Sequence, residues 1–308
     1  MMRKHLWIIA ATVLAAIIIS TSAYLFINYY YNTGENNKQA IPSELLKLYV
    51  LSALYLDKTN TMLYRSMYGL PPQSNITAKD IENLLKQYKE NEKYLPLVPV
   101  TDLDKLLIGT YNTYRNITII AEDLIDINKR ISELLPPMKK SLKDLINCNY
   151  TSAMKTYDTI RNKIIILKSE ISIVILNLTS INKKYILSPK HMETINRTAT
   201  LLQQLENMLD KYTYIMDTLK NNPSILQKAC MISSGKHPSL NQQLIQQASN
   251  LLKQMSNSQM AGLQPYKDAL QALIGSILSQ AMNNGSNNGQ SSGSTGSGAG
   301  SYNYTETD

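Results

Sequence analysis

The stretch YTSAMKTYDTIRNKIIILKSEISIVILNLTSINKKY, residues 150–185, decides the fold of this chain. Its apolar residues recur at alternating intervals of three and four over 36 residues, which is the spacing of one face of a long α-helix. Isoleucine and valine also favour β-strands, but a 3–4 period kept over this length predicts a helix. The apolar face consists of Tyr150, Ala153, Tyr157, Ile160, Ile164, Leu167, Ile171, Val174, Leu178, Ile181 and Tyr185.

The chain turns after this stretch and returns as a second long helix. Ser188 and Pro189 form a helix start, because serine caps a helix N-terminus and proline fits the first helical position. The returning helix ends at Asn222–Pro223. Its apolar stripe consists of Ile195, Thr198, Leu202, Leu205, Leu209, Tyr212, Met216 and Leu219. Long helices that are joined by short turns lie antiparallel.

Further helices are predicted on both sides of this hairpin. Pro136 and Pro137 are expected to break or kink the chain after one of them. No stretch has the alternating pattern of a strand, so we predict an all-α fold, an elongated antiparallel helical bundle. The predicted helices cover residues 43–68, 77–93, 101–135, 138–146, 223–231, 240–255 and 266–281.

Residues 6–27, LWIIAATVLAAIIISTSAYLFI, contain no charged side chain. Twenty-two residues of helix rise about 33 Å, enough to cross a bilayer core of about 30 Å. Arg3 and Lys4 precede the segment, so its N-terminus is expected in the cytoplasm and the remainder outside. The alternative is a cleaved secretory signal, but the apolar run continues beyond the usual length of a signal core. Both interpretations place the rest of the protein across the membrane.

The sequence therefore predicts five segments. Residues 283–308 are rich in Gly, Ser, Asn and Thr, and a segment of this composition cannot bury a core. The segments are a cytoplasmic flank and transmembrane anchor over 1–31, a spacer over 32–42, an extracytoplasmic helical bundle over 43–236, a C-terminal helical pair over 237–282 and a disordered tail over 283–308.

The two cysteines, Cys148 and Cys230, test the hairpin geometry. Cys148 lies 40 residues before Ser188, and Cys230 lies 42 residues after it. Antiparallel packing then brings both cysteines to the same end of the bundle, and an exported protein would join them in a disulfide. The alternative is two unrelated buried thiols.

Four asparagines are candidates for a structural or modified site. Asn60 and Asn128 interrupt apolar faces, where they are expected to fix helix register, with a polar pocket as the alternative. Asn75 and Asn149 belong to N-glycosylation sequons beside predicted turns, so they are the favoured acceptors.

The sequence offers little chemistry. The three histidines, His5, His191 and His237, form no ligand cluster with cysteine or carboxylate, and no nucleophile or phosphate-loop motif occurs. We therefore expect no catalytic residue, cofactor or metal. The net charge of +8 is spread among mixed charges rather than clustered with aromatic residues, which disfavours nucleic acid as a partner.

These observations favour a non-enzymatic protein of the cell surface that is anchored in the membrane. It would support, space or bind a protein partner or a second copy. The glutamine-rich helices after Pro238 are the best candidate surface, but the favoured alternative is that they complete the core. The alternative is an extracytoplasmic ligand-binding or sensor accessory subunit. The chain has 20 tyrosines and one phenylalanine and is rich in isoleucine, a balance that suggests an archaeal surface protein.

Overall fold

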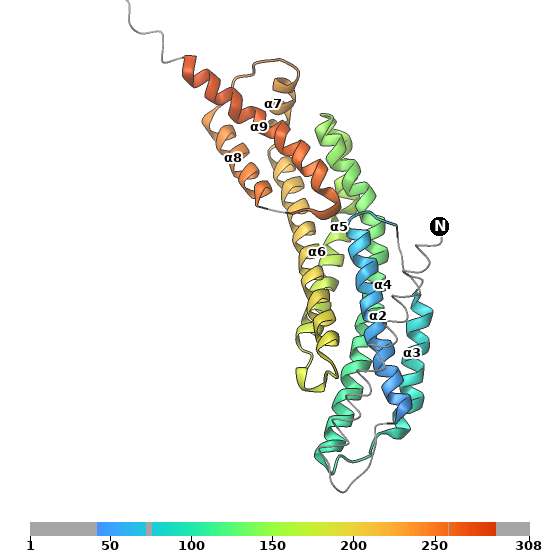
Figure 1. The fold of residues 1–308 in the computed structure, drawn as a ribbon. Coiled ribbons are helices and arrows are strands. Elements are labelled where there is room, and N and C mark those ends of the chain that lie inside the picture. Colours follow the sequence, from blue (N-terminus) through green and yellow to red (C-terminus); the bar gives the residue numbers. More distant parts are fainter. Residues whose placement is uncertain (1–41, 72–75, 258, 288–308) are drawn as a thin grey trace, which may run out of the picture. The chain divides into compact units, whose positions relative to one another are not determined.

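The computed structural model describes residues 42–71, 76–257 and 259–287. Every regular element in these residues is helical (Figure 1), which confirms the all-α prediction for this part of the chain. The predicted membrane anchor over 6–27 lies outside the described residues. Among the helices that are described, none combines the length and the apolar character needed to cross a membrane. The tail was expected from residue 283, whereas the last helix continues to Asn287.

The described residues form eight α-helices and three short 3₁₀-helices. The α-helices are α2 (Ser43–Met67), α3 (Ala78–Asn91), α4 (Asp102–Ile146), α5 (Tyr150–Thr179), α6 (Pro189–Asn221), α7 (Pro223–Ser233), α8 (Gln242–Ser256) and α9 (Gln264–Asn287). The 3₁₀-helices are η1 (Glu92–Tyr94), η2 (Lys183–Tyr185) and η3 (Ala261–Leu263).

Two of the predicted helices, now α4 and α5, differ from expectation at one point each. A break or a kink was expected at Pro136 and Pro137, and of these the break does not occur, because helix α4 continues through both prolines. The prolines remove two backbone donors, but the buried side chains of Leu134, Leu135 and Met138 hold the helix in place on both sides. Helix α5 ends at Thr179 instead of reaching Tyr185, because the chain turns and re-forms as η2.

The chain divides into two compact units, which we describe separately. Unit 1 holds the described residues up to Met138, together with Asp158–Asp210 and Met260–Leu263. Unit 2 holds Lys139–Tyr157, Lys211–Gln259 and the described residues from Gln264 onward. Along α4 the division follows directly after Pro136 and Pro137. Unit 2 thus joins α8 and α9 to the ends of three long helices.

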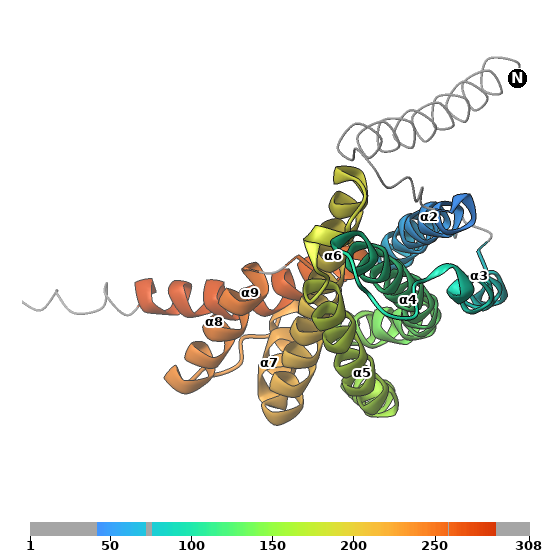
Figure 2. The same cartoon turned by 90° about the horizontal axis from the view of Figure 1, so that it is seen from below.

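Hydrogen bonds in unit 1 fix the direction of its helices. Thr118 donates to Ser52 at 2.8 Å and Ser132 donates to Ser66 at 3.2 Å, and both pairs are 66 positions apart. A constant difference in position means that α2 and α4 run parallel. The antiparallel prediction considered only chain neighbours, so it missed this pair, which α3 separates in the sequence. Figure 2, an end-on view, shows α3 beside α2 and α4.

Helices α5 and α6 pack antiparallel in unit 1, as their short connection predicts. Ser172 donates to Glu206 at 2.6 Å, and Lys168 forms an ion pair with Asp210. In both pairs the two residue numbers have the same sum, which only antiparallel helices allow. The apolar face of α5 packs inward, with Ile164, Leu167 and Ile171 fully buried.

Unit 2 has its own apolar core. The expected face of α8 is buried at Leu244, Ala248, Leu251 and Met255. Asn241 caps the helix, because its side chain accepts a hydrogen bond from the backbone N–H of Leu244 at 2.8 Å.

Candidate functional site

The two cysteines are joined in unit 2. A disulfide links Cys148 to Cys230 with their Cα atoms 5.9 Å apart, and the bond spans 82 residues. The prediction that hairpin packing brings both cysteines to one end is confirmed. Cys148 lies just after α4 and Cys230 lies within α7, so the bond ties the two ends of the α5–α6 hairpin together.

The two asparagines that interrupt the apolar faces lie inside unit 1. Asn60 is only 4% exposed. The side-chain oxygens of Asn60 and Asn128 are buried and accept no hydrogen bond from any described residue. With an offset of 66 between α2 and α4, Asn60 lies opposite position 126, within one helical turn of Asn128. Their role in fixing register stays a prediction.

The structure describes only one of the two favoured sequons. Asn75 lies outside the described residues. Asn149 is exposed at the start of α5, where its side-chain oxygen accepts a hydrogen bond from the backbone N–H of Ser152 at 3.2 Å. Thr151, the hydroxyl residue of the sequon, is exposed as well. The amide nitrogen of Asn149, the atom that carries a glycan, is therefore not used by this cap.

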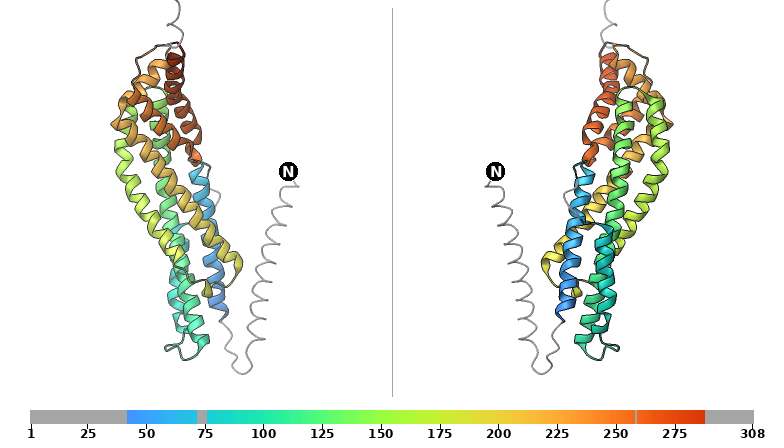
Figure 3. Two further views of the ribbon diagram at one scale, coloured as in Figure 1. Left: turned by 90° about the vertical axis from the view of Figure 1, so that its left-hand side faces the viewer. Right: turned by 90° about the vertical axis from the view of Figure 1, so that its right-hand side faces the viewer.

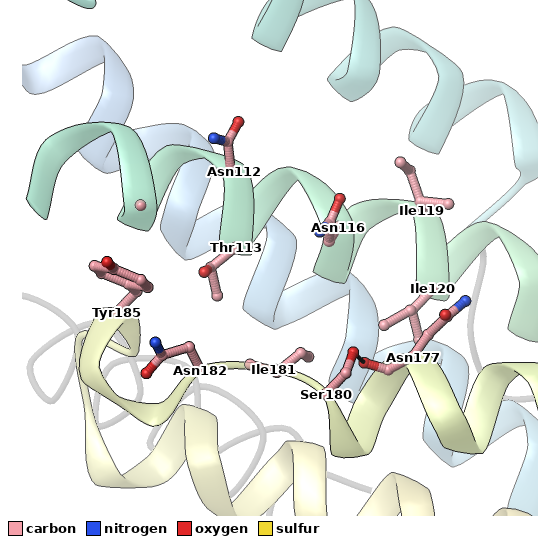
Figure 4. A pocket seen from close by; sticks show the side chains of 11 residues that line it. Asn112, Thr113, Asn116, Ile119, Ile120, Asn177, Ser180, Ile181, Asn182 and Tyr185 are labelled. Carbon is pink, nitrogen blue, oxygen red and sulfur yellow. Dashed lines mark hydrogen bonds between the residues drawn. The ribbon is translucent and has the colours of Figure 1, made fainter. Parts of the chain in front are cut away.

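A polar hollow of about 430 Å³ lies in unit 1. Figure 4 shows Asn112, Thr113 and Asn116 lining it from α4, while Asn177 lines it from the end of α5. No residue of the lining is charged. Asn112, Asn116 and Asn177 are exposed, so the hollow is an open depression with carboxamide donors and acceptors on both sides.

The close approach of Gly109 and Tyr185 closes one end of this hollow. A Cβ atom on Gly109 would lie 2.3 Å from the ring of Tyr185, so the glycine is required for the ring to pack there. Asn182 accepts from the backbone N–H of Lys184 at 3.0 Å, which starts η2 and turns the ring of Tyr185 onto α4. The only sequence signal for this site was a glycine within a helical pattern.

Tyrosine hydroxyls and small polar side chains form a buried network in unit 1. Tyr88 and Ser52 share a hydrogen bond of 2.7 Å, and Thr118 donates to Ser52. Tyr111 donates to the backbone oxygen of Tyr88 at 2.7 Å. These bonds connect α2, α3 and α4, and burial raises the pKa of the Tyr88 hydroxyl far above its usual range.

Tyr114 connects α4 to the start of α6. Its hydroxyl accepts from the backbone N–H of Leu187 at 3.0 Å and lies 2.6 Å from Nδ1 of His191. We assign the hydroxyl as donor to an unprotonated Nδ1. Burial, with a smaller effect of Lys190, lowers the pKa of His191 to about 4, so the imidazole is neutral near pH 7. The sequence placed His191 in a first helical turn and did not reveal its partner.

The loop between η1 and α4 exposes apolar side chains. The exposed fraction is 102% for Leu97, 68% for Val98 and 81% for Val100. No charged residue occurs between Lys93 and Asp102. The sequence pattern showed this proline-containing stretch only as a helix end.

Within the described residues, no group of three or more His, Cys, Asp or Glu side chains is arranged to hold a metal ion. Comparison of the chain with known protein families, with characterised proteins and with solved structures finds no match. Function must therefore be argued from the architecture and the exposed chemistry of this chain.

Proposed function

We propose that this protein is a membrane-anchored, extracytoplasmic helical bundle with a structural, scaffolding or partner-binding role at the cell surface. The observation that carries the proposal is the Cys148–Cys230 disulfide, because such bonds persist in oxidising compartments outside the cytoplasm. The uncharged residues 6–27 support it, since a segment of this length and composition can span a bilayer.

The interior of unit 1 supports a structural rather than a catalytic role. The buried hydrogen bonds between its helices are formed by tyrosine, serine and threonine hydroxyls and by the imidazole of His191; the pKa values of Tyr88 and Tyr114 are raised, and burial keeps His191 neutral. Groups of this kind fix helices relative to one another through hydrogen bonds. A general acid or base would need a pKa near the working pH, which the groups of this network do not have.

Membrane fractionation of cells that express the full chain tests this proposal. We expect the protein in the membrane fraction after a carbonate wash, with its bulk digested by protease added to intact cells. Both cysteines should resist alkylation until a reductant is added. A matched chain without residues 6–27 should leave the membrane fraction. Recovery of the full chain in the soluble fraction with two free thiols would contradict the proposal.

The polar hollow in unit 1 favours a second candidate function, an accessory subunit that binds a small ligand. Its carboxamides and the ring of Tyr185 suit a neutral polyhydroxylated ligand, which needs hydrogen bonds and an apolar face. Thermal-shift measurements with neutral oligosaccharides test this candidate. A stabilising shift should be lost in Asn112→Leu and kept in a variant of an exposed residue away from the hollow, such as Lys79→Ala. No shift with the parent chain would remove the candidate.

A further inference from the structure

We propose that the loop Leu95–Val100 inserts into the interface of the lipid bilayer and forms a second membrane contact of unit 1. The inference rests on the proposed membrane anchor and extends it to the described part of the chain. The occupant of this apolar surface is the bilayer to which residues 6–27 would attach the protein.

The side chains of the loop suit a lipid environment. Leu97, Val98 and Val100 point away from the core and are 68–102% exposed. Tyr94 and Lys93 directly precede the loop, and such residues favour the boundary between lipid and water. Insertion would remove the apolar surface from water.

Few N–H groups of the loop lack a hydrogen bond. Pro96 and Pro99 have no N–H group, and the N–H of Leu95 donates to the backbone oxygen of Glu92 at 2.9 Å. The N–H of Val100 donates to the Asp104 carboxylate at 3.1 Å. Among the described residues, the loop then has just two N–H groups without a hydrogen bond, those of Leu97 and Val98. The backbone oxygens of Leu95–Val100 accept no hydrogen bond from the described residues, so the backbone would stay in the hydrated interface while the apolar side chains enter the lipid.

The loop lies at the end of unit 1 where the chain enters from the N-terminal segment. Ser52 shares a hydrogen bond with Tyr88 near the end of α3, whereas Tyr55, further along α2, packs with Ile81 near the start of α3, so α3 runs antiparallel to α2. The residues after Tyr94 therefore come beside the first turn of α2, and Figure 3 shows the α3–α4 connection at this end.

The chain length before α2 keeps the loop close to the bilayer. Residues 28–41 separate the predicted anchor from Pro42. A chain of this length reaches at most about 50 Å. A tether of this length gives the loop a high effective concentration at the membrane surface.

A fluorescent label placed in the loop tests the proposal. Both cysteines of the chain are engaged in the disulfide, so Leu97→Cys introduces a single reactive thiol. The full chain is labelled with an environment-sensitive fluorophore and reconstituted in phosphatidylcholine vesicles that contain a lipid-attached quencher. We expect blue-shifted emission and at least twofold quenching at position 97. A label on Lys79→Cys, an exposed position at the opposite end of α3, should show neither effect.

A second variant tests whether the apolar side chains cause the insertion. A label on Val100→Cys should be quenched in the parent chain, and the added substitutions Leu97→Ser and Val98→Ser should reduce this quenching at least twofold. These side chains are exposed, so the bundle should unfold at the same denaturant concentration.

The outcomes separate the two proposals. Density-gradient flotation of the vesicles shows whether the protein is bound to them. If it floats with the vesicles but the label at position 97 is as solvent-accessible as the label at position 79, the loop proposal is wrong and the anchor proposal stands. Equal quenching at both positions would also overturn it, because insertion would not be specific to the loop. If the protein does not float with the vesicles, the anchor proposal fails.

Discussion

Cys148 forms its disulfide with Cys230 from a left-handed backbone conformation, with φ at 61°. It lies directly after α4, where the N–H of Cys148 donates to the oxygen of Leu145 and the N–H of Asn149 donates to that of Asp144. The same pair of bonds ends α2 at Gly69 and α7 at Gly235, both with positive φ. Cys148 therefore occupies the position that Gly69 and Gly235 occupy after α2 and α7. The backbone conformation at this position is unfavourable for a residue that has a side chain.

Two variants without the disulfide separate its effect from the backbone strain. Cys148→Ala/Cys230→Ala should lower the free energy of unfolding by about 4 kcal/mol, because the unfolded chain loses the constraint of a long closed loop. Cys148→Gly/Cys230→Ala should be more stable than the alanine pair by about 1 kcal/mol, since glycine adopts the left-handed conformation without steric cost. Urea unfolding monitored by circular dichroism measures both. Equal stability of the two variants would show that the backbone relaxes once the bond is absent.

Gly109→Ala tests the packing of Tyr185 on α4. The new Cβ would lie 2.3 Å from the ring, so the ring must move, and we expect destabilisation of about 1–3 kcal/mol. The matched control is Gly275→Ala in α9, where no atom lies within 4 Å of the new Cβ. This substitution should stabilise its helix by up to about 1 kcal/mol. Thermal unfolding compares the two, and a stabilised Gly109→Ala would contradict the close contact.

The sequence predicted the fold best where a pattern of neighbouring residues determines the local structure. The 3–4 period from Tyr150 to Leu178 and the helix start at Ser188–Pro189 predicted the α5–α6 hairpin, and counting from Ser188 placed Cys148 beside Cys230. These features depend on neighbours along the chain or on simple antiparallel geometry.

The features that the sequence did not reveal depend on contacts between distant segments. Nothing local shows that Tyr114 meets His191, since that contact joins α4 to α6. Pro136 and Pro137 were expected to break or kink a helix, but the helix continues because their neighbours are buried. Exposure of Leu97 was equally unpredictable, because an apolar loop is normally covered by the rest of the protein.

Acid should destabilise unit 1 through His191. Its pKa is about 4 in the folded protein and near 6.5 when unfolded, so the unfolded chain binds more protons between these values. Stability is complete above pH 6.5 and falls as the pH decreases toward 4, by at most about 3 kcal/mol. A protonated Nδ1 would also face the Tyr114 hydroxyl as a second donor. Unfolding curves from pH 7.5 to 4.5 should show this loss.

His191→Gln and Asp123→Asn separate the effects of two described groups whose shifted pKa values change stability in this range. The glutamine variant should lose the acid sensitivity that His191 causes. Burial, and the negative charges of Glu122, Asp126 and Glu170, raise the pKa of Asp123 to about 6. A raised carboxyl pKa favours the folded state at low pH, so Asp123 opposes His191, and Asp123→Asn should steepen the loss. Unchanged acid sensitivity in His191→Gln would show that another group is responsible.

Asn60→Leu should stabilise unit 1 but weaken the specificity of its helix register. The buried oxygen of Asn60 accepts no hydrogen bond from the described residues, so a leucine of similar volume removes an unfavourable group. We expect a gain of about 1–2 kcal/mol in the free energy of unfolding. A loss of stability instead would show that the oxygen has a partner, such as a buried water.

The register itself is measured with a second pair of substitutions. Ser66 and Ser132 lie with their hydroxyl oxygens 3.2 Å apart across α2 and α4, so Ser66→Cys/Ser132→Cys should form a disulfide in the native register. If Asn60 fixes this register, adding Asn60→Leu should lower the yield of the cross-link while raising stability. An unchanged yield with higher stability would mean that the apolar faces set the register alone. Together, the cross-link yield and the stability show whether Asn60 fixes the helix register or only destabilises the protein through its unpaired side-chain oxygen.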